Sequence, residues 1–200
     1  MTADADSTQT SRSRLLGAGK RLFAQNGYEQ TSTAAIARSA GSSESQLIRY
    51  FGGKAGLLEA IFNESWMGLN DDVQKQIAEA QHGRDALLRI LNLMIAALGR
   101  DDEIAFLFLF EGRRMRGAAH EVVLSRGFVQ FWDLVCKLAQ RGQEDGSFRT
   151  DVPAKVLASA MLGCAEGMMR DRLINPNDPN YTDESVQKAF EAMVNGLAAT

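Results

Sequence analysis

The sequence has little of what small proteins stabilised by disulfides or metals depend on. Among 200 residues there are two cysteines, three prolines and two histidines. Cys136 and Cys164 lie in apolar helical contexts without a metal-ligand spacing, which favours buried free thiols over a redox pair. Prolines occur only at 153, 176 and 179, so helices can run through most of the chain. We expect no metal and no cofactor.

Long hydrophobic runs are also missing. The longest apolar run, Ile104 to Phe110, has seven residues, whereas a membrane-spanning helix needs about 20. Residues 1–11 are polar and contain neither a basic segment nor an apolar stretch, which predicts a disordered tail rather than a secretion signal. We therefore expect a cytoplasmic protein without membrane association.

Catalytic patterns are weak. Gly17-Ala18-Gly19-Lys20 shares letters with a phosphate-binding loop, but it lacks the full spacing and sits inside an amphipathic pattern with no preceding strand. The acids at 71–72 and 101–103 suit solvated or helix-starting positions, and His82 and His120 have no partner pattern. An enzyme is therefore disfavoured.

The segment from Arg12 to Leu58 has the pattern of three short helices and the start of a fourth. Leucines and Phe23 recur at helical spacing from Arg12 to Asn26, and Gly27 follows as a helix terminator. One of Thr31, Ser32 and Thr33, with Thr33 favoured, is expected to cap a second helix that ends at Gly41. Ser42-Ser43-Glu44 then caps and charges a third helix, Glu44 to Phe51. This layout is that of a helix-turn-helix DNA-binding unit.

The third predicted helix has an inner and an outer face. Leu47 and Phe51 are four residues apart and share the inner face, while Ser45 and Arg49 lie opposite. Arginine suits guanine edges and glutamine suits adenine, so the outer face, flanked by Gln46 and Ile48, fits a major groove. The alternative is that the apolar side chains of this helix, Leu47, Ile48, Tyr50 and Phe51, only close a small helical core.

The spacing resembles the signature of the tetracycline-repressor (TetR) family. The residues that carry it are Leu16-x-x-Gly19-x-x-Leu22-Phe23-x-x-x-Gly27-Tyr28-x-x-Thr31-Ser32-Thr33-x-x-Ile36-Ala37-x-x-Ala40-Gly41-Ser42-Ser43 and Leu47-x-x-Tyr50-Phe51-x-x-Lys54-x-x-Leu57-Leu58. The resemblance implies that Thr33, Tyr50 and Lys54 grip phosphates. It further implies that the following residues face or approach bases: Ala34, Ser43, Ser45, Gln46, Ile48 and Arg49. Glu44 completes the predicted DNA-binding set. Ser42 and the pair Ile48-Arg49 replace residues common in the family, which affects the operator sequence more than the act of binding.

Charge divides the chain in the same place. Residues 12–54 carry seven Lys or Arg against Glu29 and Glu44, a formal charge of +5, while residues 55–200 carry −6. Only the N-terminal head is therefore expected to approach a polyanion.

The rest of the chain reads as successive helices. Breaks rich in glycine, proline or polar residues delimit helices near 54–81, 84–98, 102–116, 119–141, 153–173 and 183–197. The alternation Phe106-x-Phe108-x-Phe110 also suits a strand, but without a partner strand a buried helix is favoured.

The last two predicted helices carry stripes that suit a dimer interface. Val156, Ala160, Gly163 and Gly167 recur at four, three and four residues and would let another helix approach closely. The final helix repeats this spacing with Val186, Phe190, Met193 and Leu197. The resemblance implies an intermolecular four-helix bundle; the alternative is that both stripes belong to the chain's own core.

Large apolar side chains on several helices form a candidate effector pocket, although each alone equally suits plain core. They are Met94, Phe106, Phe110, Phe128, Phe131, Trp132, Met161 and Met168. The candidate polar anchors, with surface positions as the alternative, are Glu111, Arg113, Arg114 and Glu166.

The sequence thus predicts an all-α protein in which a three-helix helix-turn-helix head is joined to a larger helical body. The expected divisions are a tail at 1–11, a DNA-binding domain at 12–58 and a regulatory and dimerisation domain at 59–200. The function expected from the resemblance is a homodimeric, ligand-responsive repressor of a pseudo-palindromic double-stranded operator, released by a small-molecule effector. The alternatives are a helical small-molecule-binding protein without DNA binding and, less favoured, an enzyme.

Overall fold

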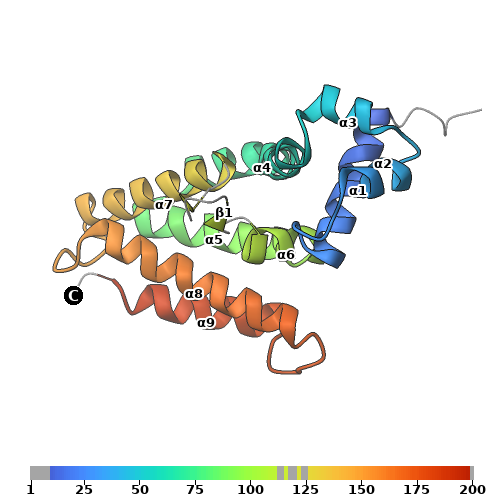
Figure 1. The fold of residues 1–200 in the computed structure, drawn as a ribbon. Coiled ribbons are helices and arrows are strands. Elements are labelled where there is room, and N and C mark those ends of the chain that lie inside the picture. The colour runs from blue at the N-terminus through green and yellow to red at the C-terminus, as the bar shows by residue number, and fades with distance from the viewer. Residues whose placement is uncertain (1–9, 112–114, 117–120, 123–125, 199–200) are drawn as a thin grey trace, which may run out of the picture. The chain divides into compact units, whose positions relative to one another are not determined.

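The structure is a computed structural model that describes residues 10–111, 115–116, 121–122 and 126–198. The chain divides into two compact units, residues 1–65 and 66–200 (Figure 1). The described part is almost entirely helical, which confirms the predicted all-α class. Its elements are α1 (Ser11–Asn26), α2 (Thr33–Ser39), α3 (Glu44–Phe51), α4 (Lys54–Glu79), α5 (Gly83–Leu98), α6 (Asp102–Phe106), the π-helix η1 (Leu107–Glu111), β1 (Met115–Arg116), β2 (Glu121–Val122), α7 (Arg126–Glu144), α8 (Ala154–Ile174) and α9 (Asp183–Asn195).

The helices of the first unit begin at hydroxyl caps. Thr10 caps α1 and Ser43 caps α3, each by accepting a backbone N–H. For α2 the cap is Ser32, whose Oγ accepts from the Ala35 N–H, so the prediction of Thr33 as the cap is wrong by one residue. The tail predicted at 1–11 also ends too late, because Thr10 caps α1 and Ser11 is its first residue. Its residues 1–9 lie outside the described residues.

The first unit is held together by close helix packing and by hydrogen bonds to exposed backbone groups. A Cβ on Gly19 of α1 would lie 2.7 Å from the Leu57 side chain of α4, so a larger residue there would require the Leu57 side chain to shift. The buried Thr31 hydroxyl bonds the Leu22 and Gly27 carbonyls. Since buried polar groups cost stability unless they are paired, this bond secures the turn after α1. The fully buried side chains of the unit are Leu15, Phe23, Ile36, Leu47 and Leu57.

In the second unit α5 is the central helix. It packs against α7, α8 and α9, and α7 and α9 also pack against α8. The core lies between these four helices and includes Leu87, Ile90, Val135, Met161 and Phe190. Figure 1 shows α8 and α9 side by side, in orange and red.

The region after α5 differs in part from the sequence prediction. Residues Phe106 to Phe110 are helical, as expected, but the helix ends at Glu111 as a π-turn rather than continuing to 116. Met115–Arg116 instead pairs in antiparallel fashion with Glu121–Val122, and α7 begins at Arg126 rather than at 119. Gly112 and Gly117 have low helix propensity, which explains why a helical pattern read across them fails.

No helix in the described part of the chain is long and apolar enough to cross a membrane.

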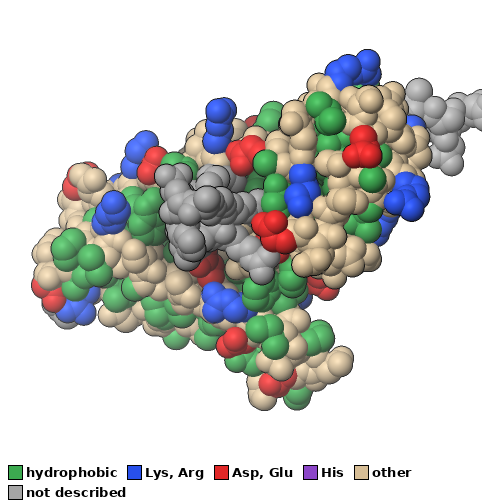
Figure 2. Space-filling view, in the orientation of Figure 1, with side chains coloured by type: hydrophobic (Ala, Val, Ile, Leu, Met, Phe, Trp, Pro, Cys, Tyr) green, Lys and Arg blue, Asp and Glu red, His purple; other side chains and the backbone are tan. Residues whose placement is uncertain are grey.

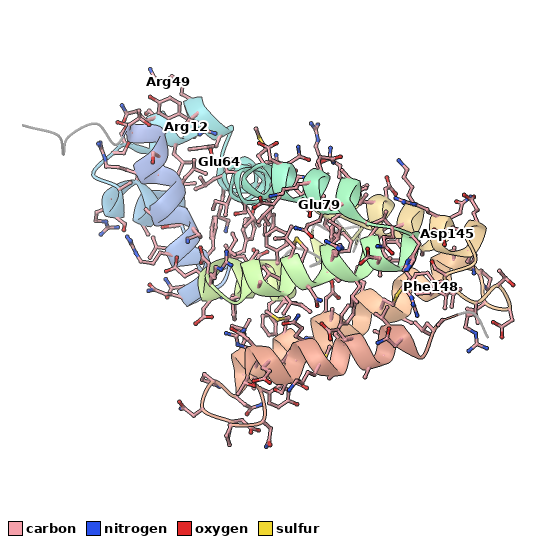
Figure 3. All side chains as sticks on the ribbon, turned by 180° about the vertical axis from the view of Figure 1, so that it is seen from behind. Arg12, Arg49, Glu64, Glu79, Asp145 and Phe148 are labelled. Atoms are coloured by element: carbon pink, nitrogen blue, oxygen red, sulfur yellow. The ribbon has the colours of Figure 1, made fainter. Side chains whose placement is uncertain are left out.

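The contact between α5 and α7 allows a test of the second unit. A Cβ on Gly83 would lie 2.1 Å from the backbone N of Gly142, and one on Gly142 would lie 2.4 Å from the Phe148 ring. The Gly83 N–H also donates to Asp145 Oδ2 at 2.6 Å, near the residues labelled in Figure 3. The two helices therefore meet through their backbones.

We expect Gly83→Ala to lower the free energy of unfolding by about 1 to 3 kcal/mol, because the added methyl must push backbone apart. Gly68→Ala on α4 is the matched control, since a Cβ there meets nothing within 4 Å. The control should gain up to about 1 kcal/mol from helix propensity. Thermal and urea denaturation of both variants measures this, and equal stability of Gly83→Ala and the unchanged protein would contradict it.

Candidate DNA-binding surface and ligand cavity

Helix α3 is fixed at both ends. Its N-cap Ser43 accepts from the Gln46 N–H at 3.2 Å, and its C-cap Gly52 adopts φ 74° and donates to the Ile48 carbonyl at 2.7 Å. Only glycine adopts such a left-handed conformation without strain. Leu47 is completely buried and anchors one side of the helix. The opposite side is therefore held outward in a defined orientation.

The outward side of α3 is exposed and carries polar and apolar groups. Ser45 and Arg49 are exposed, as are Ile48 at 56 % and Tyr50 at 39 %. Ile48 and Tyr50 are thus not core residues, and the alternative that they only close a small core is wrong. Arg49 Nη2 donates to Tyr50 Oη at 3.1 Å, and its guanidinium lies 4.9 Å from the centre of that ring. Figure 3 shows Arg49 pointing outward from this unit.

The first turn of α3 is tied to its surroundings by two side-chain hydrogen bonds. Thr33 Oγ1 donates to Glu44 Oε2 at 2.6 Å, and Ser42 Oγ donates to Gln46 Oε1 at 2.5 Å. Gln46 is half-buried and Glu44 is exposed. Ser43 is exposed at the start of α3, and Ala34 is half-buried in the first turn of α2. The predicted DNA-binding residues Thr33, Ala34, Ser43, Glu44 and Gln46 thus lie at the N-termini of α2 and α3.

Lys54 begins α4 and contacts the turn after α1. Its Nζ donates to the Tyr28 carbonyl at 2.9 Å and to the Glu29 carbonyl at 3.4 Å, and lies 4.3 Å from the centre of the Tyr28 ring. These two bonds use two of its three N–H donors. A phosphate grip by Lys54 therefore depends on one remaining donor and on the charge.

Basic side chains surround this set. The exposed ones are Arg12, Arg14, Arg21, Arg38 and Arg49. Figure 2 shows Lys and Arg side chains on the visible face of this unit. The arrangement suits electrostatic attraction of a polyanion and reading of base edges by one short helix.

The second unit contains a cavity of about 50 Å³. Trp66 and Phe131 form part of its wall, with ring centres 5.4 Å apart and planes at 66°. Its lining is apolar apart from Glu166 and consists of Trp66, Leu91, Met94, Ile95, Leu98, Phe108, Leu109, Phe128, Phe131, Leu162, Ala165, Glu166 and Met169.

Three of the predicted ligand-binding residues line this cavity: Met94, Phe128 and Phe131. The other five lie outside this lining. Phe106 and Phe110 pack against each other with ring centres 4.8 Å apart, Met161 is completely buried in the core, and Trp132 and Met168 pack against the core from outside.

Sequence reasoning also missed residues of the lining. Phe108 lies between Phe106 and Phe110 in the same apolar alternation, so that pattern could have included it. In the structure it belongs to η1 and lines the cavity. Trp66 on α4 is large and apolar and lies within the predicted regulatory domain, but it was not included in the candidate set. Of the candidate polar anchors, Glu166 lines the cavity, Glu111 is buried at 3 % exposure, and Arg113 and Arg114 lie outside the described residues.

The proposed dimer stripes differ in their exposure. On α8, Val156 is 54 % exposed, Ala160 and Gly163 are exposed, and Gly167 is half-buried. A Cβ on either glycine would meet nothing within 4 Å in the described part of the chain. This stripe is therefore an accessible surface of small side chains.

The stripe predicted on the last helix faces the chain's own core rather than solvent. Val186 and Phe190 are buried in the chain's own core, which does not suit the partner interface predicted for them, while Met193 and Leu197 are half-buried against that core. The reason is that this apolar face packs on α5 and α8. The opposite face of α9 is exposed and includes the small side chains of Ala189 and Ala192.

The cysteines and acids offer no metal or redox centre in the described residues. Cys136 and Cys164 are half-buried and unpaired with each other, and burial raises the pKa of the Cys136 thiol. No group of three or more His, Cys, Asp or Glu within residues 10–111 and 126–198 is placed to hold a metal.

Comparison with known proteins identifies the N-terminal unit. Residues 15–61 match the family model described as bacterial regulatory proteins, tetR family. The fatty acid metabolism regulator protein of Bacillus subtilis (strain 168) is 20 % identical over 189 residues, covering 92 % of this chain and 94 % of that protein.

Solved structures share the whole fold. The fatty acid degradation regulator FadR from Bacillus halodurans superposes with a TM-score of 0.80 at 19 % identity, covering 96 % of this chain and 98 % of that one. FadR from Bacillus subtilis, solved in complex with stearoyl-CoA, has a TM-score of 0.78 at 17 % identity and covers 92 % of this chain and 97 % of that one. The N-terminal helix-turn-helix unit is thus similar to that of the tetR family of bacterial regulatory proteins, which it matches at residues 15–61, and the chain as a whole shares the fold of these solved regulators.

Proposed function

We propose that the protein is a ligand-responsive transcriptional repressor. It binds a pseudo-palindromic DNA operator as a homodimer and is released by a small apolar or aromatic effector. The observation that carries this proposal is the geometry of α3, which is capped at Ser43 and Gly52, anchored by the buried Leu47, and turned outward along the side that carries Ser45 and Arg49.

The dimensions of α3 suit a major groove. An α-helix with its side chains is about 10 to 12 Å across, and a B-DNA major groove is about 12 Å wide. Arg49 is exposed and braced by Tyr50, so its guanidinium is pre-oriented for a bidentate contact with guanine. The basic side chains around the helix supply sequence-independent attraction to phosphates.

Two heads are needed to read two half-sites. A C2 dimer presents them about 34 Å apart on successive major grooves, which is why the operator should be pseudo-palindromic. The exposed small residues Ala160, Gly163 and Gly167 on α8, together with Ala189 and Ala192 on α9, offer the surface for close helix pairing. We therefore place the dimer interface on this α8–α9 face.

The cavity of the second unit is the proposed effector site. Its wall is aromatic and aliphatic, and Met94 and Met169 can adapt to different apolar shapes. The π-turn η1 supplies Phe108 and Leu109 to the lining, and such turns recur at functional sites. The stearoyl-CoA complex of the Bacillus subtilis relative supports an apolar effector. The volume of about 50 Å³ suits a small group or requires the side chains to move apart.

Helix α4 provides a covalent route from effector to head. It begins at Lys54 in the first unit and carries Trp66, which lines the cavity in the second. An effector that favours one position of Trp66 would thereby bias the position of the helix that follows α3. By linkage, such an effector weakens operator binding as much as the operator weakens effector binding.

A helical small-molecule-binding protein without DNA binding is the second candidate, favoured by the cavity alone. It would show no salt-dependent affinity for duplex DNA. An enzyme would turn over the compound that it binds.

We expect the affinity for duplex DNA to fall steeply as salt rises, because each head displaces counterions from phosphates. Arg49→Ala should lose about 1 to 3 kcal/mol per half-site on the selected operator and relax the preference for guanine. The control is Arg100→Ala, an exposed arginine of the second unit. Fluorescence anisotropy at several salt concentrations measures both, and a flat salt slope for the unchanged protein would rule out the DNA-binding role.

The dimer surface is tested with Gly163→Leu, which should separate the paired helices by filling the close-contact stripe. Dimerisation and operator binding should then be lost together. Gly68→Leu is the matched control, because Gly68 is equally open but lies on α4. Sedimentation that finds an intact Gly163→Leu dimer would place the interface elsewhere.

The effector site is tested with two aromatic residues of α7. Medium-chain alcohols and alkylbenzenes should raise the melting temperature of the free protein, since they bind the folded state. Phe128→Ala should reduce this shift, whereas Trp132→Ala, outside the cavity lining, should retain it. Both variants are compared with their own ligand-free melting temperature. An equally reduced thermal shift in both variants would indicate that the ligand binds outside this cavity.

A further inference from the structure

The first residue of the outward helix is an acid in a basic head. Glu44 opens α3, is exposed, and accepts the Thr33 hydroxyl at Oε2 over 2.6 Å. In a helix that docks into a major groove, the N-terminal residues are the ones that contact base edges. Glu44 thus occupies the position nearest the bases while carrying the charge that phosphates repel.

Capping does not account for this carboxylate. The side chain that receives the first free N–H of α3 is Ser43, whose Oγ accepts from Gln46 N at 3.2 Å. The Glu44 carboxylate suits the positive end of the helix dipole, as an acid in the first turn does, but its hydrogen bond runs across to Thr33 in the first turn of α2. One of its oxygens is engaged by that hydroxyl, and the other can accept a hydrogen bond from a ligand.

We infer that Glu44 is a specificity-determining residue that accepts a hydrogen bond from the N4 amino group of a cytosine in each half-site. This inference rests on the proposed function, because it requires α3 to enter a major groove. Thr33 is the positioning residue that orients the carboxylate.

The major-groove edges of the four bases explain the preference. Cytosine offers only an amino donor at this edge, whereas guanine offers two acceptors and thymine an acceptor and a methyl group. Adenine offers a donor beside an acceptor. A carboxylate has acceptors alone, so guanine and thymine would leave a desolvated charge facing a lone pair. Cytosine is therefore the base that this group selects.

Glu44 and Arg49 read different positions. Glu44 lies one turn before Ile48 on the same side of α3, whereas Arg49 lies one turn after Ser45. Ile48 is 56 % exposed and adds an apolar surface to the side of the helix that carries Glu44. The cytosine is thus expected at a position separate from the guanine assigned to Arg49.

The thermodynamic consequence is discrimination more than affinity. An acid beside DNA weakens attraction to every duplex, and this loss is recovered only where a cytosine amino group pairs with it. Removing the charge should therefore raise non-specific affinity while lowering the ratio between operator and random DNA.

The test is selection of bound sequences from a random duplex pool with the full-length protein and Glu44→Gln. The unchanged protein should select a cytosine column in each half-site. Glu44→Gln should lower that preference by roughly tenfold and shift it toward adenine, because an amide offers both a donor and an acceptor. Glu29→Gln is the charge-matched control: Glu29 is exposed in the same unit, outside α2 and α3, and its variant should keep the cytosine column.

Thr33→Val tests the positioning role. It keeps the shape of the side chain but removes the donor to Glu44, so it should weaken the cytosine column while leaving the guanine column intact. Circular dichroism confirms that each variant remains helical. A cytosine column of full strength in Thr33→Val would overturn the role of Thr33.

The outcomes separate this inference from the function on which it rests. An operator with an Arg49-dependent guanine but no cytosine column overturns the inference alone. So does an equal rise in affinity for all duplexes in Glu44→Gln and Glu29→Gln without a changed column. Failure of the unchanged protein to select any sequence would instead overturn DNA binding itself.

Discussion

The burial of Leu47 is the constraint on which the candidate interface depends. This side chain has no exposed surface, so it fixes the rotation of α3 about its own axis. A helix of eight residues has too few turns to be stable alone, and here its ends are held by Ser43 and by the left-handed Gly52. The rotation and the two caps together determine which side chains face outward. These outward side chains are the ones available for the proposed contact with an operator.

The formal charge of the head overstates what is available to DNA. Several of its basic groups serve inside the unit: Arg12 pairs with Glu64, Arg14 donates to the Ala40 carbonyl, Arg21 donates to Ser39, and Lys54 donates to the Tyr28 carbonyl. Such contacts orient the helices while keeping the charge near the surface. The head therefore combines a long-range attraction set by charge with short-range contacts limited to a few side chains, Arg49 foremost. Glu44, at the start of α3, adds a negative charge to this surface, so the proposed contact would favour specificity over raw affinity.

The sequence predicted the helices well where local signals agree, and the site less well. The bounds of α3 were predicted from Ser43, Leu47 and Gly52, since cap, core position and terminator all pointed to the same segment. The choice between the neighbouring hydroxyls of Ser32 and Thr33 as a cap was beyond a local pattern, because it depends on their partners in the structure: Ser32 accepts from the Ala35 N–H, and Thr33 donates to Glu44. Helical periodicity also cannot tell an inward apolar stripe from an interface. Phe190 shows this, since its stripe packs on the chain's own core.

The cavity was hard to predict for a related reason. A lining residue and a core residue have the same chemistry, so Phe128 and Trp132 on α7 looked equivalent, and only the packing of three-dimensional neighbours puts one in the wall. The cavity is lined in part by irregular backbone. The helix changes from α geometry in α6 to π geometry in η1 at Leu107, which rotates the side chains that follow relative to a regular helix. A regular α-helix through Phe110 would present a different set of side chains to Trp66. The proposed effector site and its link to α4 thus depend on a local departure from the helical rule that otherwise describes this chain.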